Sequence, residues 1–166
     1  MIIAIAAVTL DGRIAAHEKH FSDWTSAEDK DVMRKLLDGS DVVLVGHNTY
    51  KTAIQPLSKR SCIVLTSSVT EVKKESDLVT YINPQYSDLK KILSEYAIVA
   101  CLGGTQTYTY LLEHGMLDEI YLTIEPIIFG TGLPLFQTKH SVQQRWNLIS
   151  MKSLNEHGSM LLHYKK

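Results

Sequence analysis

The sequence predicts a three-layer α/β fold, in which helices cover both faces of a mixed, mainly parallel sheet that ends in an antiparallel hairpin. Up to about residue 115, short apolar runs take turns with stretches of helical spacing, which is typical of parallel strands joined by helices. After residue 118 the runs are longer and partly alternate polar with apolar residues, which indicates antiparallel strands. No linker, repeat or shift of composition divides the chain, so we expect one domain over residues 1–166.

Each apolar run gives one expected strand. Runs without alternation suit strands that are covered on both faces, and alternating runs suit strands with one exposed face. The segment 155–158, Asn-Glu-His-Gly, is a good turn between the last two strands. In chain order the expected strands are 2–8, 41–46, 61–66, 78–82, 97–102, 118–125, about 144–154 and 159–165.

Helices are expected where apolar residues recur three and four positions apart and a capping residue precedes them. Asp11-Gly12 signals a turn rather than a helix, and Pro56 is expected to break the chain before the third strand. The expected helices run from Thr25 or Ser26 to Gly39, over 87–95 with Ser87 as the cap, and over 105–114 up to Gly115.

Composition excludes several classes of protein. The 17 basic and 18 acidic side chains give a net charge of −1, which supplies no long-range attraction to nucleic acid or to an acidic membrane. The apolar start has no basic residue before it, and no segment reaches the roughly 18 uncharged residues of a membrane span. Cys62 and Cys101 lie inside apolar runs, as small buried residues do. We expect a cytoplasmic protein with a small-molecule substrate; whether the strands after residue 140 pair with a second copy, as in a homodimer, stays open.

Two strand-to-helix junctions are candidate phosphate sites. Glycine lets the backbone approach a phosphate, and the free N–H groups at a helix start donate hydrogen bonds to an anion. Neither junction matches a P-loop or the GxGxxG motif, and plain tight turns are the alternative interpretation. The two junctions are Gly46-His47-Asn48-Thr49 and Gly103-Gly104-Thr105-Gln106-Thr107.

Two acids, Glu28 and Asp29, lie in the first turn of the first expected helix. Thr25-x-x-Glu28 and Ser26-x-x-Asp29 are both capping-box patterns, so capping is the favoured interpretation of these residues alone. The alternative is that one acid caps while the other points into apolar surroundings near Trp24. Such a half-buried carboxyl group has a raised pKa and can deliver a proton near neutral pH.

The histidines do not indicate a metal site. His17 and His20 lack the spacing of a zinc-binding HExxH motif, and no cysteine is close to them in the sequence. No GxSxG motif is present either, so a serine-hydrolase arrangement is not predicted. We expect these histidines on the surface or in turns.

An ordered set of motifs resembles the dihydrofolate reductase-like superfamily. Its closest resemblance is to the reductase domain of riboflavin biosynthesis, the RibD C-terminal family. Each motif is weak alone, but together they span residues 1 to about 136 in the order and spacing of that family. The motifs are Val-Thr-Leu-Asp-Gly-Arg-Ile-Ala at 8–15, Trp-Thr-Ser at 24–26, Val-Gly-His-Asn-Thr-Tyr at 45–50, Val-Leu-Thr-Ser-Ser at 64–68, Leu-Gly-Gly-Thr at 102–105, Leu-Asp-Glu-Ile-Tyr-Leu-Thr at 117–123, and Pro126 through Gly130-Thr131-Gly132.

The resemblance implies NADPH as the cofactor. It places the nicotinamide beside two apolar residues, the phosphates at the two junctions, and the adenosine end with its 2′-phosphate after the third strand. The family also has a cis peptide bond between two such glycines. The implied cofactor residues are Ala7, Ile14, Gly46, His47, Asn48, Thr49, Leu65, Thr66, Ser67, Gly103, Gly104, Thr105, Gln106, Thr107 and Tyr108.

The resemblance also implies catalytic and substrate residues. Asp29, five residues after Trp24, matches the catalytic acid of the folate branch, with Glu28 as the fallback, and Thr123 matches the threonine that supports it. Arg60 falls where that branch has an arginine for the folate carboxylate. The implied substrate residues are Ile5, Trp24, Met33, Ile54, Arg60 and Leu102.

The chain departs from the riboflavin enzymes in two places. Leu102 stands where a glutamate usually precedes the paired glycines, and the segment 51–56 lacks the expected Asp-Asp-Pro. Both departures lie where a ribosylaminopyrimidine phosphate would be held. The expected activity is hydride transfer from NADPH to a carbon–nitrogen double bond of a pyrimidine or pterin, most like that of a 5-amino-6-(5-phosphoribosylamino)uracil reductase. Dihydrofolate reductase and an inactive nucleotide-binding module are the alternatives.

Overall fold

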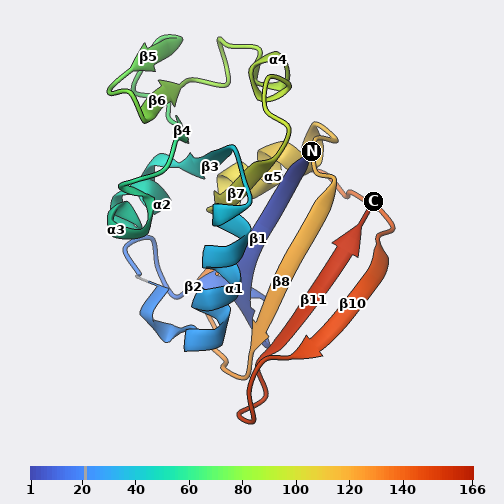
Figure 1. The fold of residues 1–166 in the computed structure, drawn as a ribbon. Helices are drawn as coiled ribbons and strands as arrows, with labels where there is room; N and C mark the ends of the chain where they lie inside the picture. Colours follow the sequence, from blue (N-terminus) through green and yellow to red (C-terminus); the bar gives the residue numbers. More distant parts are fainter. Residues whose placement is uncertain (21) are drawn as a thin grey trace.

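The computed structural model describes residues 1–20 and 22–166, and all of their side chains except those of Ser22 and Ile54. Its described residues form one nine-stranded sheet in the order β10-β11-β8-β1-β7-β3-β4-β6-β5, and a two-stranded sheet of β2 and β9 (Figure 1). The strands are β1 (Ile2–Thr9), β2 (Arg13–Ala15), β3 (Val42–Gly46), β4 (Cys62–Leu65), β5 (Val72–Lys74), β6 (Val79–Ile82), β7 (Val99–Gly103), β8 (Glu119–Glu125), β9 (Leu133–Pro134), β10 (Asn147–Ser153) and β11 (Met160–Lys165).

The central strands are parallel and the C-terminal ones antiparallel, as the sequence predicts. β1 pairs in parallel with β7 on one side and β8 on the other. β11 then pairs antiparallel with β8, and β10 pairs antiparallel with β11. The helices are the 3₁₀-helix η1 (Ser22–Trp24), α1 (Ala27–Asp38), α2 (His47–Thr52), α3 (Ile54–Leu57), α4 (Leu89–Leu93) and α5 (Thr105–Glu113).

The sheet has a buried core on each face. Figure 1 shows α1 in front of the central strands and α5 behind them. Leu37 of α1 packs on one face with the odd-numbered residues of β1, and Leu111 of α5 packs on the other face with the even-numbered ones. Successive residues of β1 point to opposite faces, and both faces are covered. Residues 2–8 are therefore all apolar.

Several details differ from the sequence-based expectations. Asp88, not Ser87, caps α4, because the Asp88 carboxylate accepts the N–H of Lys91 at 3.0 Å. Pro56 does not break the chain before β4; it lies in the single turn of α3, where its missing N–H costs no helical hydrogen bond. The short strands β2, β5 and β9 were not expected, because two or three residues carry no readable periodicity.

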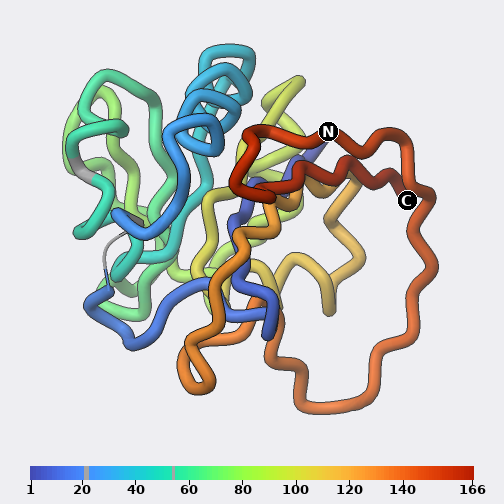
Figure 2. Tube along the Cα trace, turned by 90° about the horizontal axis from the view of Figure 1, so that it is seen from below, coloured from blue at the N-terminus to red at the C-terminus, as the bar shows by residue number. Residues whose placement is uncertain are grey.

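β10 is the edge strand of the sheet, and all seven of its residues are exposed. The chain between Phe136 and Trp146 forms a loop that extends away from the rest of the protein before β10 begins (Figure 2). Exposure on both faces distinguishes β10 from the other strands of the large sheet except the short β5.

Cys62 and Cys101 are free and buried, as predicted. Burial raises the pKa of the Cys62 thiol to about 11 and that of Cys101 to about 12. Among the described residues, no helix has the length and apolar character to cross a membrane.

Candidate active site

The two glycine junctions lie side by side at the carboxyl edge of the sheet. β3 and β7 are neighbours, and Val45 pairs with Gly103 in their register. A Cβ atom on Gly46 would lie 2.8 Å from Thr107 Oγ1, and one on Gly104 would lie 3.2 Å from Thr49 Oγ1. Each junction therefore reaches into the other, and side chains on these glycines would fill the space between them.

The helices that follow the junctions begin without a side-chain cap. Gly46 is the N-cap of α2 and Gly104 is the N-cap of α5, and neither residue has a side chain to accept a first-turn N–H. The Gly103–Gly104 peptide bond is cis, as the resemblance implies. Gly103 also has φ +77°, and a side chain on it would collide with the ring of Tyr108.

The two glycine junctions together form a cradle of backbone at the sheet edge. The residues around this cradle fit a dinucleotide. His47 Nδ1 is buried and, among the described residues, has no hydrogen-bond partner. Leu65 pairs with Gly46 in the sheet, so the Thr66 and Ser67 hydroxyls follow at the same edge. Ile14 Cδ1 lies 3.8 Å from the Cβ position of Gly104. Bare backbone, hydroxyl groups and one unpaired imidazole nitrogen are the groups that phosphate and ribose oxygens need.

Two of the expected cofactor residues support the cradle through their side chains instead of lining it. Tyr108 is buried in the core, and its hydroxyl donates to the carbonyl oxygen of Ile5 at 2.5 Å. The Thr105 hydroxyl donates to the carbonyl oxygen of Pro134 at 2.5 Å. Only the backbone of these two residues remains for a ligand. Asn48 and Gln106 are exposed beside the junctions.

Asp29 lies in the first turn of α1 with its side chain partly buried against β8. Burial raises the pKa of the Asp29 carboxyl; hydrogen bonds from the Thr123 and Thr25 hydroxyls oppose that rise, and the nearby charge of Glu125 adds to it. Thr123 pairs with Ala7 of β1, so the threonine and the expected nicotinamide neighbour lie on adjacent strands, beside the helix turn that carries the acid.

Glu28 lies apart from Asp29, on the surface of the same helix. Its carboxylate accepts a hydrogen bond from Asn155 Nδ2 at 3.2 Å, and this bond is the main reason why the pKa of Glu28 is lowered. A carboxyl group that holds its proton weakly is a poor proton donor near neutral pH. Of the two acids, only Asp29 has a raised pKa and so keeps its proton to higher pH.

The capping-box expectation is confirmed for Ser26 as the N-cap, but it is wrong for the bond that an acid of α1 would return. Ser26 is the N-cap of α1 and accepts the N–H of Asp29 at 3.2 Å, but its own N–H donates to Glu125 Oε1 at 2.8 Å. In a capping box the N–H of the N-cap residue donates to an acid of the same helix. Here the Ser26 N–H donates instead to Glu125, at the end of β8. Sequence reasoning missed Glu125; the available signal was an acid two residues after Thr123 in an alternating strand.

Apolar side chains border the acid on the α1 face of the sheet. Met33 lies one turn after Asp29 and packs, with Leu102, against the core cluster that contains Ile5. The Trp24 ring meets the Phe129 ring edge-on, with centroids 5.1 Å apart. Ile5, Met33 and Leu102 thus share one apolar cluster and Trp24 packs on Phe129, while the side chain of Ile54 is outside the described part of the structure.

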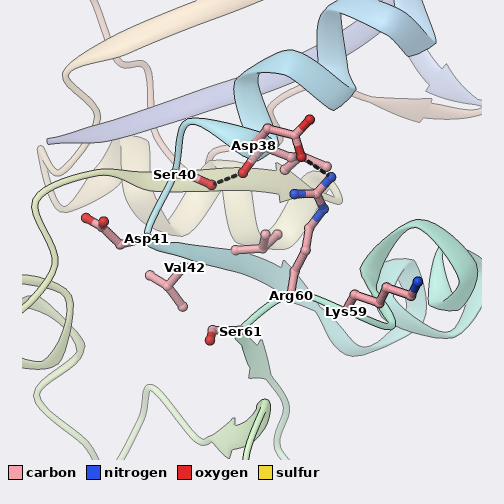
Figure 3. A pocket seen from close by; sticks show the side chains of 9 residues that line it. Asp38, Ser40, Asp41, Val42, Lys59, Arg60 and Ser61 are labelled. Atoms are coloured by element: carbon pink, nitrogen blue, oxygen red, sulfur yellow. Dashed lines mark hydrogen bonds and ion pairs between the residues drawn. The ribbon is translucent and has the colours of Figure 1, made fainter.

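Arg60 lies at the other end of α1, in a shallow pocket (Figure 3). Its guanidinium pairs with Asp38 at 2.7 Å and donates from Nε to the carbonyl oxygen of Pro56 at 3.2 Å. Asp38 is nine residues after Asp29, which is roughly 14 Å along a helix. Arg60 is therefore distant from the acid and is already paired with a carboxylate.

The paired histidines lie in a turn next to the site. His20 Nδ1 accepts the N–H of Ala16 at 2.9 Å, and its ring contacts those of His17 and Phe129. Within residues 1–20 and 22–166, no group of His, Cys, Asp or Glu side chains is arranged to hold a metal ion.

The sequence model of the family described as Dihydrofolate reductase matches residues 1–161. The chain belongs to the dihydrofolate reductase family. The match covers both junctions, the acid and most of the antiparallel strands, so the motif-based resemblance is confirmed. A protein of similar length from Bacillus subtilis (strain 168), described as the uncharacterized protein YwjB, is 27% identical over 169 residues, 95% of this chain and 93% of its own.

Solved structures share the dihydrofolate reductase fold with this chain. A pyrimidine reductase-like protein from Corynebacterium diphtheriae has a TM-score of 0.78 at 18% identity, over 99% of this chain and 90% of its own. A diaminohydroxyphosphoribosylaminopyrimidine deaminase/5-amino-6-(5-phosphoribosylamino)uracil reductase from Thermotoga maritima has a TM-score of 0.75 at 20% identity, over 99% and 56%. The dihydrofolate reductase of Enterococcus faecalis, complexed with NADP(H) and RAB-propyl, has a TM-score of 0.71 at 19% identity, over 99% and 95%.

Proposed function

We propose that this member of the dihydrofolate reductase family is an NADPH-dependent reductase of a carbon–nitrogen double bond in an aminopyrimidine or pterin. The observation that carries the proposal is the position of Asp29. This half-buried acid is bonded to Thr123, which pairs across the sheet with Ala7, and the glycine cradle opens at the same sheet edge. A proton donor beside a dinucleotide-shaped cradle is what such a reduction requires.

The cradle residues would hold the cofactor. Backbone N–H groups at the starts of α2 and α5 would bind its phosphates, and Thr66, Ser67 and His47 would bind its adenosine end. Bound NADPH supplies the hydride. Gly46 and Gly104 let the two junctions approach each other, because a Cβ atom on either residue would crowd a threonine of the other junction. The protein's main contribution is to hold the two reactants face to face.

Asp29 would supply the proton. The hydride adds to the carbon of the double bond, and the nitrogen takes a proton from the Asp29 carboxyl, so that the bond becomes a saturated amine. Burial keeps the pKa of Asp29 above its ordinary value, so more of the protonated acid remains at higher pH. Thr123 and Thr25 fix the orientation of the carboxyl through their hydrogen bonds.

An aminopyrimidine such as the phosphoribosylamino-uracil is favoured over dihydrofolate. The folate branch needs a cation for its glutamate carboxylate, and Arg60 is already paired with Asp38. The fold likeness to the Corynebacterium and Thermotoga proteins supports the same choice. Dihydrofolate is the second candidate, favoured by the position of Asp29 five residues after Trp24 and by the contact with Thr123. The third candidate is a nucleotide-binding module without turnover, because Leu102 stands where the riboflavin enzymes usually have a glutamate.

A second copy of this chain is the partner that β10 fits. Ile149 and Met151 are 52% and 65% exposed on an edge strand whose single charge is Lys152. Natural edge strands of this length usually carry more charge or a proline to prevent pairing. In antiparallel pairing centred on Ser150, Ile149 of each copy would lie opposite Met151 of the other copy, and the two Lys152 side chains would be apart. We therefore propose a twofold homodimer at this edge.

The deciding experiment follows NADPH oxidation by absorbance with each substrate in turn. We expect turnover with the ribosylaminouracil, weaker or no turnover with dihydrofolate, and a strong preference for NADPH over NADH. Asp29→Asn is the matched control, because it keeps the size of the side chain and removes the proton. Tight NADPH binding with every substrate inert would instead support the non-catalytic module.

A further inference from the structure

Two acids of the described residues are buried and unused by the proposed reaction, and of these Glu119 is paired with His163 and Lys165, whereas Glu125 has no cation. Glu125 closes β8, is 3% exposed, and faces the same side as Thr123, two residues before it. None of the ion pairs among the described residues involves Glu125. A buried carboxyl group without a cation needs strong hydrogen bonds to offset its lost hydration.

Two serines supply those hydrogen bonds. Glu125 Oε1 accepts from the N–H and the Oγ of Ser26, at 2.8 and 2.7 Å, and Oε2 accepts from Ser159 Oγ at 2.5 Å. Ser26 Oγ in turn accepts the N–H of Asp29, and Ser159 Oγ accepts from Asn155 Nδ2. Each hydroxyl accepts one N–H and donates its own proton to Glu125. Three donors on two oxygens fit a carboxylate.

This network determines what the Asp29 side chain can do. In a capping box the acid at this position turns back onto the N–H of the N-cap residue. Glu125 occupies that N–H, so the Asp29 carboxyl is left for Thr123 and Thr25. The hydrogen bond from Ser159 also ties the turn between β10 and β11 to the start of α1.

The same turn is tied a second time. Asn155 donates to Glu28 at 3.2 Å as well as to Ser159. Figure 1 shows this turn next to the end of α1 at which the helix begins. The hairpin and the acid-bearing turn of α1 are thus held as one unit through Glu125.

We propose that Glu125 is a positioning residue of the reductase site: it caps α1 in place of Asp29 and so keeps the Asp29 carboxyl turned toward Thr123 and the substrate. The inference rests on the proposed function, since Glu125 acts through Asp29. Glu125 also places a fixed negative charge beside the acid, which disfavours ionisation of Asp29.

The other groups that face Asp29 define what the test must control. Burial is the largest influence on its pKa, and the Thr123 and Thr25 hydroxyls are neutral donors. Lys30 of the same helix acts in the opposite direction to Glu125. The Tyr108 hydroxyl of α5 is also close, since the Asp29 charge adds to the effect of burial and of Cys101 in raising the pKa of Tyr108.

The test is a carboxyl-¹³C NMR titration of Asp29 in the free protein, assigned with Asp29→Asn. Glu125→Gln keeps the shape of the side chain and removes its charge, while Ser159→Ala removes one hydrogen bond and keeps the charge. We expect the Asp29 midpoint to fall by at least half a pH unit in Glu125→Gln, about a threefold change in its ionisation constant, and not to fall in Ser159→Ala. An unchanged midpoint in Glu125→Gln, or an equal fall in both variants, overturns the proposal.

Turnover gives the second measurement. With the charge removed, the pH profile of Glu125→Gln should shift to lower pH while its NADPH affinity stays within twofold of wild type. A purely structural role predicts a uniform loss at all pH values. If Glu125→Gln does not fold, Ser159→Ala decides, with a several-fold loss of turnover expected and unchanged turnover overturning the proposal. If the wild type reduces no substrate, the proposed function fails, but the titration still decides the role of Glu125.

Discussion

The hydroxyl of Thr123 faces the carboxyl of Asp29 and opposes the rise in its pKa that burial causes, so β8 meets the first turn of α1. Because Thr123 pairs in register with Ala7, this contact places the acid over the central strands of the sheet. Met33, one turn after Asp29 on α1, and Leu102 of β7 pack against the apolar cluster on this face of the sheet. A proton held at this position is partly shielded from water and close to the cradle edge.

Replacing Asp29 by asparagine should reduce turnover by roughly 10²- to 10⁴-fold, the usual contribution of a general acid. Wild-type turnover should fall as pH rises through the pKa of Asp29, which lies above its ordinary value of 3.8, because the proton donor is lost. The variant should lack this alkaline decline. Steady-state rates from pH 5 to 9 check both points, and full activity in the variant would remove Asp29 from the mechanism.

The stability of Asp29→Asn relative to wild type should increase from acid to neutral pH. Folded Asp29 binds its proton more tightly than the unfolded chain does, because burial raises its pKa. Wild-type stability therefore falls as pH rises from about 4 to the folded-state pKa, whereas asparagine does not titrate. Thermal unfolding at pH 4 and pH 8 measures the difference, and a constant difference in Tm would show that the pKa is not raised.

Removing the Arg60 guanidinium should separate the two substrate classes. Arg60→Ala breaks a half-exposed ion pair with Asp38, which costs about 0.2–1 kcal/mol of stability. We expect KM for the aminopyrimidine to change less than threefold, because Arg60 lies at the far end of α1. Arg34→Ala, which breaks the exposed pair with Asp31 on the same helix, is the control. A tenfold loss specific to Arg60→Ala would place the substrate's anion at Arg60.

A charge on β10 should prevent the proposed dimer. Met151→Lys would oppose Ile149 of the second copy and weaken association at least tenfold, about 1.4 kcal/mol. Light scattering coupled to gel filtration measures this directly. Tyr86→Lys, at an equally exposed residue outside the strand, is the control. A dimer that survives Met151→Lys would mean that another surface makes the contact.

The parts of the fold that sequence predicted well are those with a strong physical pattern. The apolar run of β1 has no polar residue because both faces are covered, so its strand was predicted to within one residue. The short β5 was missed because its residues are all exposed and nothing constrains their periodicity. Ser87 and Asp88 are both good caps, and only the local backbone selects Asp88.

The candidate site shows the same limit. The glycine junctions could be predicted because glycine is required where two backbone segments approach each other. Glu125 could not, because its partners Ser26 and Ser159 are 99 and 34 residues away and only folding brings them together. The choice between Glu28 and Asp29 likewise depended on which one the distant Asn155 binds.

The most direct test of the account is the affinity for NADPH, measured by calorimetry, in wild type, Gly46→Ala and Gly39→Ala. A Cβ atom on Gly46 would lie 2.8 Å from Thr107 Oγ1 inside the cradle, whereas one on Gly39 would meet nothing nearer than 3.7 Å. We predict saturable binding by wild type and Gly39→Ala, and at least tenfold weaker binding by Gly46→Ala, whose Tm is measured alongside to show that it is folded. No binding by wild type, or equal binding by all three proteins, would contradict the assignment of this cradle to NADPH.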